Sequence, residues 1–154
     1  MTRGRGRVLG LDVGSRRLGV AVSDPSGTVA TPLATVPRRT PAADAAELRR
    51  LAAEQQATTI VVGLPLTLAG REGRAAAEVR AYAAELAKLL PGIAFELADE
   101  RLSTVAAERA LIGGGVRRRQ RRDLVDQVAA SVFLQTWLNM RQGEGTRRGR
   151  EVSG

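Results

Sequence analysis

The stretch VLGLDVGSRRLGVAVSD at residues 8–24 indicates how this chain begins to fold. An apolar run that contains one acid, Asp12, turns over a short Gly-Ser link and resumes as a second apolar run. This pattern predicts a β-hairpin. A buried carboxylate is costly unless a partner compensates for its charge. Asp12 is therefore expected either to fix the turn or to bind a cation.

The rest of the chain alternates strand and helix patterns. Besides the hairpin strands, at residues 7–13 and 18–23, strands are expected at 28–36, 59–63 and 93–98, and helices at 41–56, 73–90, 103–112 and 123–140. Three hairpin-linked strands followed by alternating elements predict an α/β fold with helices on both faces of a mixed sheet. The sheet would have five strands, three antiparallel plus two parallel.

The length of 154 residues favours a single domain. We expect this domain at residues 1–140, followed by a basic tail without fixed structure at residues 141–154. No apolar run approaches the ~20 residues that a membrane span needs, and the basic N-terminus leads into a strand rather than a signal sequence. These features predict a cytoplasmic protein with no membrane partner.

Cysteine and histidine are both absent from the sequence. Their absence excludes disulfides, zinc–thiolate sites and mechanisms that use an imidazole. Catalysis would have to use carboxylates, hydroxyls, arginines, Lys88 or a metal held by oxygen ligands. The formal net charge of +8 favours a polyanionic partner, most simply nucleic acid, although an Arg- and Ala-rich composition is also typical of a GC-rich genome.

Acids from distant parts of the chain occur where a site could form. Asp12 lies in the first strand, Asp99 and Glu100 follow the last strand, and Asp126 lies in the first turn of the last helix. Sites in open α/β sheets form where strand ends meet helix starts. Clustered carboxylates suit Mg²⁺ or Mn²⁺, and two such ions can promote phosphodiester hydrolysis. Each acid also has a structural alternative, as a turn residue, an exposed loop residue or a helix-dipole partner.

Four blocks resemble, in order, the conserved blocks of the YqgF/RuvX family: VLGLDVGSRRLGVAVSD, VVGLPLTLAG, ELADERLSTVAAERAL and DLVDQVAASVFLQTWL. Members are small bacterial proteins with a ribonuclease H-like fold. They are described as Holliday junction resolvases or as nucleases that mature the 5′ end of pre-16S rRNA. The resemblance implies that Asp12, Glu100 and Asp126 are the catalytic and metal-binding acids, with Glu100 preferred to Asp99.

The resemblance also implies the activity and partners. We expect an endonuclease that depends on Mg²⁺ or Mn²⁺ and acts on branched DNA or precursor rRNA, within a homodimer if it cuts junctions symmetrically. The chain departs from the family in the loop after Gly63-Leu64-Pro65, where Thr67 and Ala69 replace an asparagine and an acid. This departure puts polar substrate contacts from the loop in doubt, but not the metal site.

Arginines near the proposed site are expected to contact nucleic acid. A run of five arginines within residues 117–122 precedes the helix with Asp126 and suits a clamp on the phosphate backbone; its alternative is a solvated loop. The expected contacts are Arg16, Arg17, Arg71, Arg101, Arg117, Arg118, Arg119, Arg121 and Arg122. Aromatic residues form only 3% of the chain, which disfavours recognition by base stacking.

Two other classes of protein fit parts of the sequence. The sugar kinase, actin and Hsp70 ATPases share the hairpin with an acid in its first strand, but they clasp a nucleotide between two such domains, and this chain has room for one. A non-catalytic nucleic-acid-binding module is the stronger alternative, because fold does not imply activity. The presence of all three acids favours the nuclease.

Overall fold

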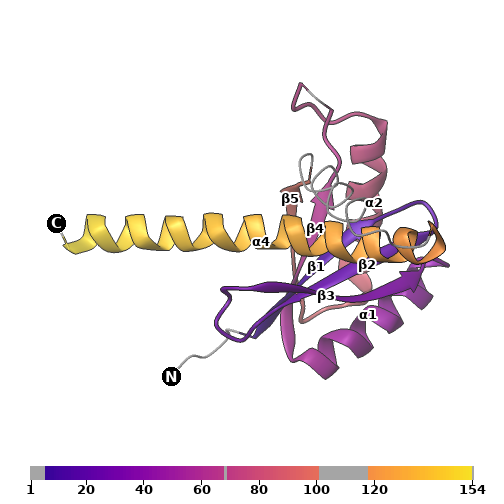
Figure 1. The fold of residues 1–154 in the computed structure, drawn as a ribbon, viewed down its shortest axis with the longest axis horizontal. Helices are drawn as coiled ribbons and strands as arrows, with labels where there is room; N and C mark the ends of the chain where they lie inside the picture. The colour runs from indigo at the N-terminus through magenta and orange to yellow at the C-terminus, as the bar shows by residue number, and fades with distance from the viewer. Residues whose placement is uncertain (1–5, 68, 101–117, 154) are drawn as a thin grey trace.

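The computed structural model describes residues 6–67, 69–100 and 118–153 (Figure 1). The elements are β1 (Arg7–Val13), β2 (Arg17–Ser23), β3 (Ala30–Pro37), α1 (Pro41–Gln55), β4 (Ala57–Leu64), α2 (Arg74–Leu89), β5 (Ala94–Asp99) and α4 (Arg118–Ser153). The helix predicted at residues 103–112 lies outside the described residues.

The five strands form one mixed sheet in the order β3-β2-β1-β4-β5. β1 pairs antiparallel with β2, and β2 pairs antiparallel with β3. β4 runs parallel to β1, and β5 runs parallel to β4. The predicted sheet of three antiparallel plus two parallel strands is therefore confirmed, and β1, which contains Asp12, is its central strand.

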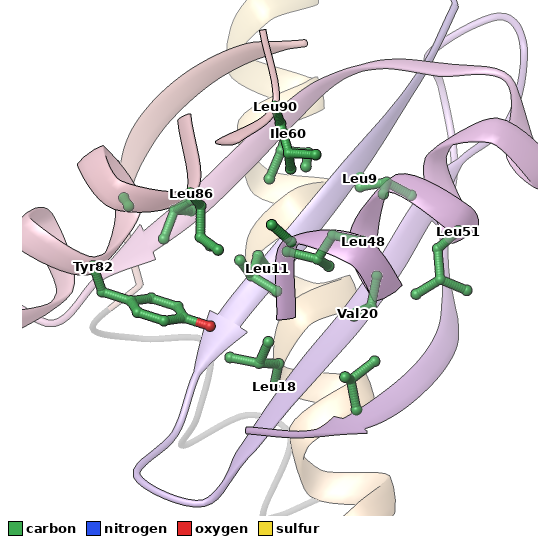
Figure 2. Close-up of a cluster of buried hydrophobic side chains, with 14 of the residues drawn as sticks. Leu9, Leu11, Leu18, Val20, Leu48, Leu51, Ile60, Tyr82, Leu86 and Leu90 are labelled. Atoms are coloured by element: carbon green, nitrogen blue, oxygen red, sulfur yellow. The ribbon is translucent and has the colours of Figure 1, made fainter. Parts of the chain in front are cut away.

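The sheet face toward α1 and α2 carries large aliphatic side chains. Leu9 and Leu11 of β1 and Ile60 of β4 are fully buried in this layer. Figure 2 shows Leu48 of α1 and Leu86 of α2 among these strand side chains. Such close-packed burial, on the order of 1.5–3 kcal/mol for each large side chain, is the main source of stability in a domain of this size.

One charged residue, Asp44 of α1, is buried in the same layer. Thr40 caps the helix by accepting a hydrogen bond from the Ala43 amide at 3.2 Å. Asp44 follows in the first turn, where it accepts hydrogen bonds from the Arg39 amide at 2.9 Å and from the Tyr82 hydroxyl of α2 at 2.6 Å. These bonds satisfy a carboxylate that would otherwise be costly to bury.

α4 covers the opposite face of the sheet. Phe133 and Leu134 pack there against Val8, Ala21 and Val61. The helix begins before the predicted residue 123 and runs through residues 141–153, for which the sequence predicts no fixed structure. No proline occurs in residues 118–153, so every amide after the first turn can donate to the carbonyl four residues earlier. In Figure 1 its C-terminal half projects beyond the sheet; the division of the chain into a domain and a tail stays a prediction.

In the part of the chain that the structure describes, no helix combines the length and apolarity needed to cross a membrane.

Candidate active site

Strand alternation places Asp12 on the face that α4 covers. Leu9 and Leu11 belong to the aliphatic layer against α1 and α2, whereas Val8 packs against α4. Because side chains alternate along a strand, Asp12 shares the face of Val8. Its antiparallel partner on β2 is Gly19, which carries no side chain to cover the carboxylate.

The same alternation distinguishes Glu100 from Asp99. Ala98, near the end of β5, packs with the residues under α4, so Glu100 continues on that face and Asp99 points away from it. The Glu100 amide donates to the Leu64 carbonyl at 3.4 Å. A Cβ atom on Gly63 would overlap the Glu100 carboxylate. Gly63 therefore provides the space that Glu100 occupies.

Asp12 and Glu100 form a hydrogen-bonded carboxyl pair. Burial, followed by the charge and hydrogen bond of Asp12, raises the pKa of Glu100 to about 9. Burial also raises the pKa of Asp12, although the hydrogen bond from Glu100 opposes that shift. Without a cation, the pair therefore retains a proton at neutral pH that the two carboxyls share.

Asp126 reaches this region from α4. A Cβ atom on Gly19 would overlap the backbone carbonyl of Asp126, so the glycine lets α4 lie directly on β2. The Asp126 carboxylate accepts a hydrogen bond from the Arg17 Nε atom at 2.9 Å. Its charge also acts on Asp12, whose pKa it raises. Asp126 thus lies beside the carboxyl pair but forms an ion pair with Arg17.

The structure brings Asp12 and Glu100 into contact, with Asp126 as a neighbour. Among residues 6–67, 69–100 and 118–153, no three acidic side chains stand arranged around a common metal position. The donor chemistry nevertheless fits Mg²⁺ or Mn²⁺, because all three groups offer carboxylate oxygens. A cation would also relieve the repulsion between two partly buried carboxylates in contact.

The predicted nucleic-acid contacts fall into three groups. Arg16 in the hairpin turn and Arg71 in the loop before α2 are exposed, whereas Arg17 contacts Asp126. Arg101 and Arg117 lie outside the described residues. The remaining positions of the arginine run, 118, 119, 121 and 122, belong to the first turns of α4.

The sequence does not point to Arg38, which braces the hairpin turn. The Arg38 Nη1 atom donates to the Gly14 carbonyl at 2.9 Å, and the Arg38 amide donates to the Arg16 carbonyl at 2.9 Å. The guanidinium also stacks 4.2 Å from the centre of the Tyr82 ring. No local pattern marks these contacts, because they join residues far apart in the chain.

Solved structures confirm the ribonuclease H-like fold. The chain is similar to Thermus thermophilus RuvC in complex with a Holliday junction substrate, with a TM-score of 0.53, 18% identity and coverage of 89% of this chain and 96% of that one. It is also similar to the Fowlpox virus resolvase in complex with Holliday junction DNA, with a TM-score of 0.50, 6% identity and coverage of 87% and 97%. At these identities the likeness shows the fold alone.

Other proteins are much more similar to this chain in sequence than these two solved structures are. A Nocardia farcinica protein named "Putative pre-16S rRNA nuclease" is 49% identical over 144 residues, covering 90% of this chain and 80% of the relative. A Mycobacterium tuberculosis protein of the same name is 46% identical over 151 residues, covering 97% and 89%. The family model described as RuvX, Holliday junction resolvase, matches residues 6–140. The chain therefore belongs to the RuvX (YqgF) family.

Proposed function

We propose that this protein is a divalent-metal-dependent endonuclease that hydrolyses phosphodiester bonds of structured nucleic acid. One observation carries the proposal: Asp12 of β1 and Glu100, which directly follows β5, are in contact and partly buried, and the Asp126 charge acts on Asp12. Carboxylates removed from water are costly unless a positive charge lies beside them. Their arrangement here therefore indicates a cation-binding site.

Asp12, Glu100 and Asp126 would hold Mg²⁺ or Mn²⁺. Cations bound there would supply an activated water and charge neutralisation at the phosphate, as a two-metal site does. The protein's own residues set the geometry. Gly63 leaves space for Glu100, and Gly19 lets α4 bring Asp126 against β2. The exposed Arg16 and Arg71 would bind the phosphate backbone outside the acids.

The substrate would be precursor rRNA or branched DNA. The names of the relatives at 46–49% identity favour precursor rRNA, and the family description favours a four-way DNA junction. A resolvase must place two symmetric cuts and would need a dimer, whereas an rRNA-maturing enzyme could act as a monomer. Cleavage of the two substrates by one preparation, with light scattering for the oligomeric state, distinguishes them.

The experiment compares the wild type with Asp12→Asn in the presence of Mg²⁺ or Mn²⁺. We expect cleavage to fall by about 1,000-fold or more, since an amide cannot replace a carboxylate as a metal ligand, while circular dichroism stays unchanged. Asp99→Asn is the matched control, because Asp99 is exposed and points away from Asp12. Its cleavage rate should stay within about threefold of the wild type.

Cleavage that survives Asp12→Asn would contradict the proposal. Wild-type protein that binds both substrates but cuts neither would favour the non-catalytic module.

A further inference from the structure

Arg17 lies on the same sheet face as the acids. It begins β2, two residues before Gly19, so both residues face α4. Its Nε atom donates to the Asp126 carboxylate at 2.9 Å, and the two side chains are 36% and 22% exposed. The sequence predicts that Arg17 contacts a phosphate. In the structure, its side chain binds Asp126, one of the three proposed metal-binding acids.

The backbone that carries Arg17 is fixed on several sides. The Gly14 amide donates to the Arg17 carbonyl at 2.8 Å. Arg38 donates to the carbonyls of Gly14 and Arg16, and it is itself stacked on Tyr82. The contact between Arg17 and Asp126 can therefore be broken by rotation of the side chains, without movement of the hairpin.

We propose that Arg17 is a positioning residue that stands in for a cation at Asp126 and must release this carboxylate before a divalent ion can bind there. This inference rests on the proposed function. It explains why Asp12 and Glu100 touch while Asp126 is turned toward β2, and why the described residues contain no ready group of three acidic ligands.

The strength of the ion pair between Arg17 and Asp126 determines how far Arg17 lowers the metal affinity. A partly exposed pair is weak, because water and salt screen it. Competition from Arg17 should therefore lower the metal affinity by only about three- to tenfold, which tunes the site without blocking it.

The test is calorimetric titration of the full chain with Mn²⁺ in the absence of nucleic acid. We compare the wild type, Arg17→Gln and Arg17→Lys, with Arg16→Gln as the control. Arg16→Gln removes the same charge from the adjacent turn residue, whose side chain is exposed. Thermal melting with and without Mn²⁺ provides a second readout.

Arg17→Gln should bind Mn²⁺ about three- to tenfold more tightly than the wild type, and the melting temperature should rise more on addition of Mn²⁺. Arg17→Lys, which keeps a more weakly directed charge, should fall between the two. Arg16→Gln should stay within about twofold of the wild type. The gap between Arg17→Gln and the wild type should narrow at high salt.

Equal or weaker Mn²⁺ binding by Arg17→Gln, beside a wild type that binds, would overturn the inference and leave the metal site standing. An equal gain in Arg16→Gln would also overturn it, since the effect would then be general charge. If Arg17→Gln is unfolded, the same comparison is decided by Arg17→Lys. Absence of Mn²⁺ binding in every chain, including the wild type, would instead refute the proposed function itself.

Discussion

The two faces of the sheet are both apolar, but they differ in the size of the strand side chains. The face toward α1 and α2 is filled with leucine, isoleucine and valine (Figure 2). The face toward α4 has glycines at positions 10, 19 and 63, where a Cβ atom would overlap α4 or Glu100. The first face anchors the sheet, and the second leaves space in which a helix and carboxylates come together. The three acids thus lie on one face of the sheet, and the larger aliphatic layer lies on the other.

The largest expected effect on stability lies on the aliphatic face. Leu48 of α1 is fully buried, so Leu48→Ala should lower the free energy of unfolding by about 3 kcal/mol. Urea denaturation followed by circular dichroism measures the change. The cleavage rate of the folded fraction should stay within about twofold, because the acids lie on the other face.

Arg50→Ala is the control on the same helix. Arg50 is exposed and pairs only with Glu47 and Glu54 among the described ion pairs, so its loss should leave the urea midpoint nearly unchanged, because water and salt screen exposed ion pairs. A loss of cleavage in Leu48→Ala that exceeds its loss of folded protein would argue against the separation of the faces.

The next effect concerns activity alone. Gly63→Ala should displace the Glu100 carboxylate and reduce cleavage by about 10- to 100-fold, or about 1.4–2.7 kcal/mol. Its free energy of unfolding should change by about 1 kcal/mol or less, since the side chain that it meets can move. In a Glu100→Gln background the same substitution should add little, which a double-mutant cycle measures. Additive losses would show that Gly63 acts elsewhere.

Glu100→Gln tests the burial of the carboxyl pair. The folded protein keeps a proton on Glu100 up to a pKa of about 9, whereas the unfolded chain loses it near 4.5. The Glu100 carboxyl therefore makes its full contribution to the free energy of unfolding below pH 4.5, and this contribution is lost as the pH rises toward 9. In EDTA, Glu100→Gln should avoid this loss and be more stable than the wild type at about pH 7.5.

Melting temperatures of both chains from pH 5 to pH 9 provide the measurement. The advantage of Glu100→Gln should grow with pH. A constant difference across this range would mean that Glu100 titrates normally in the folded protein.

The smallest effect concerns the polar exception on the aliphatic face. Tyr82→Phe removes the hydroxyl that donates to the buried Asp44, so it should lower the free energy of unfolding by about 1–2 kcal/mol. The Arg39 amide still donates a hydrogen bond to the Asp44 carboxylate, which limits the loss of stability. Urea denaturation checks the value, and an unchanged midpoint would show that the hydroxyl bond contributes nothing.

The strands and the three acids could be predicted because their signals are local. Apolar alternation marks the strands, and a carboxylate within an apolar run marks Asp12 as unusual. The contact between Asp12 and Glu100 could be predicted only once β4 is known to pair with both β1 and β5. By contrast, Arg17 and Asp126 are 109 positions apart, and no pattern in either segment predicts their ion pair.

Asp44 shows the same limit on the other face. In the sequence it is an acid in the first turn of an Ala-rich helix, a position typical of a solvated residue that favours the helix dipole. Its burial depends on Tyr82, which is 38 positions away. Long-range polar partners of this kind are decided by packing, which periodicity does not describe.

An anomalous difference map from a crystal soaked in Mn²⁺ tests the proposed metal site most directly. We expect strong peaks bound by oxygens of Asp12, Glu100 and Asp126, with Asp126 turned away from Arg17. Mn²⁺ at saturating concentration that leaves these three carboxylates unoccupied, or that binds only elsewhere on the protein, would contradict the proposed site.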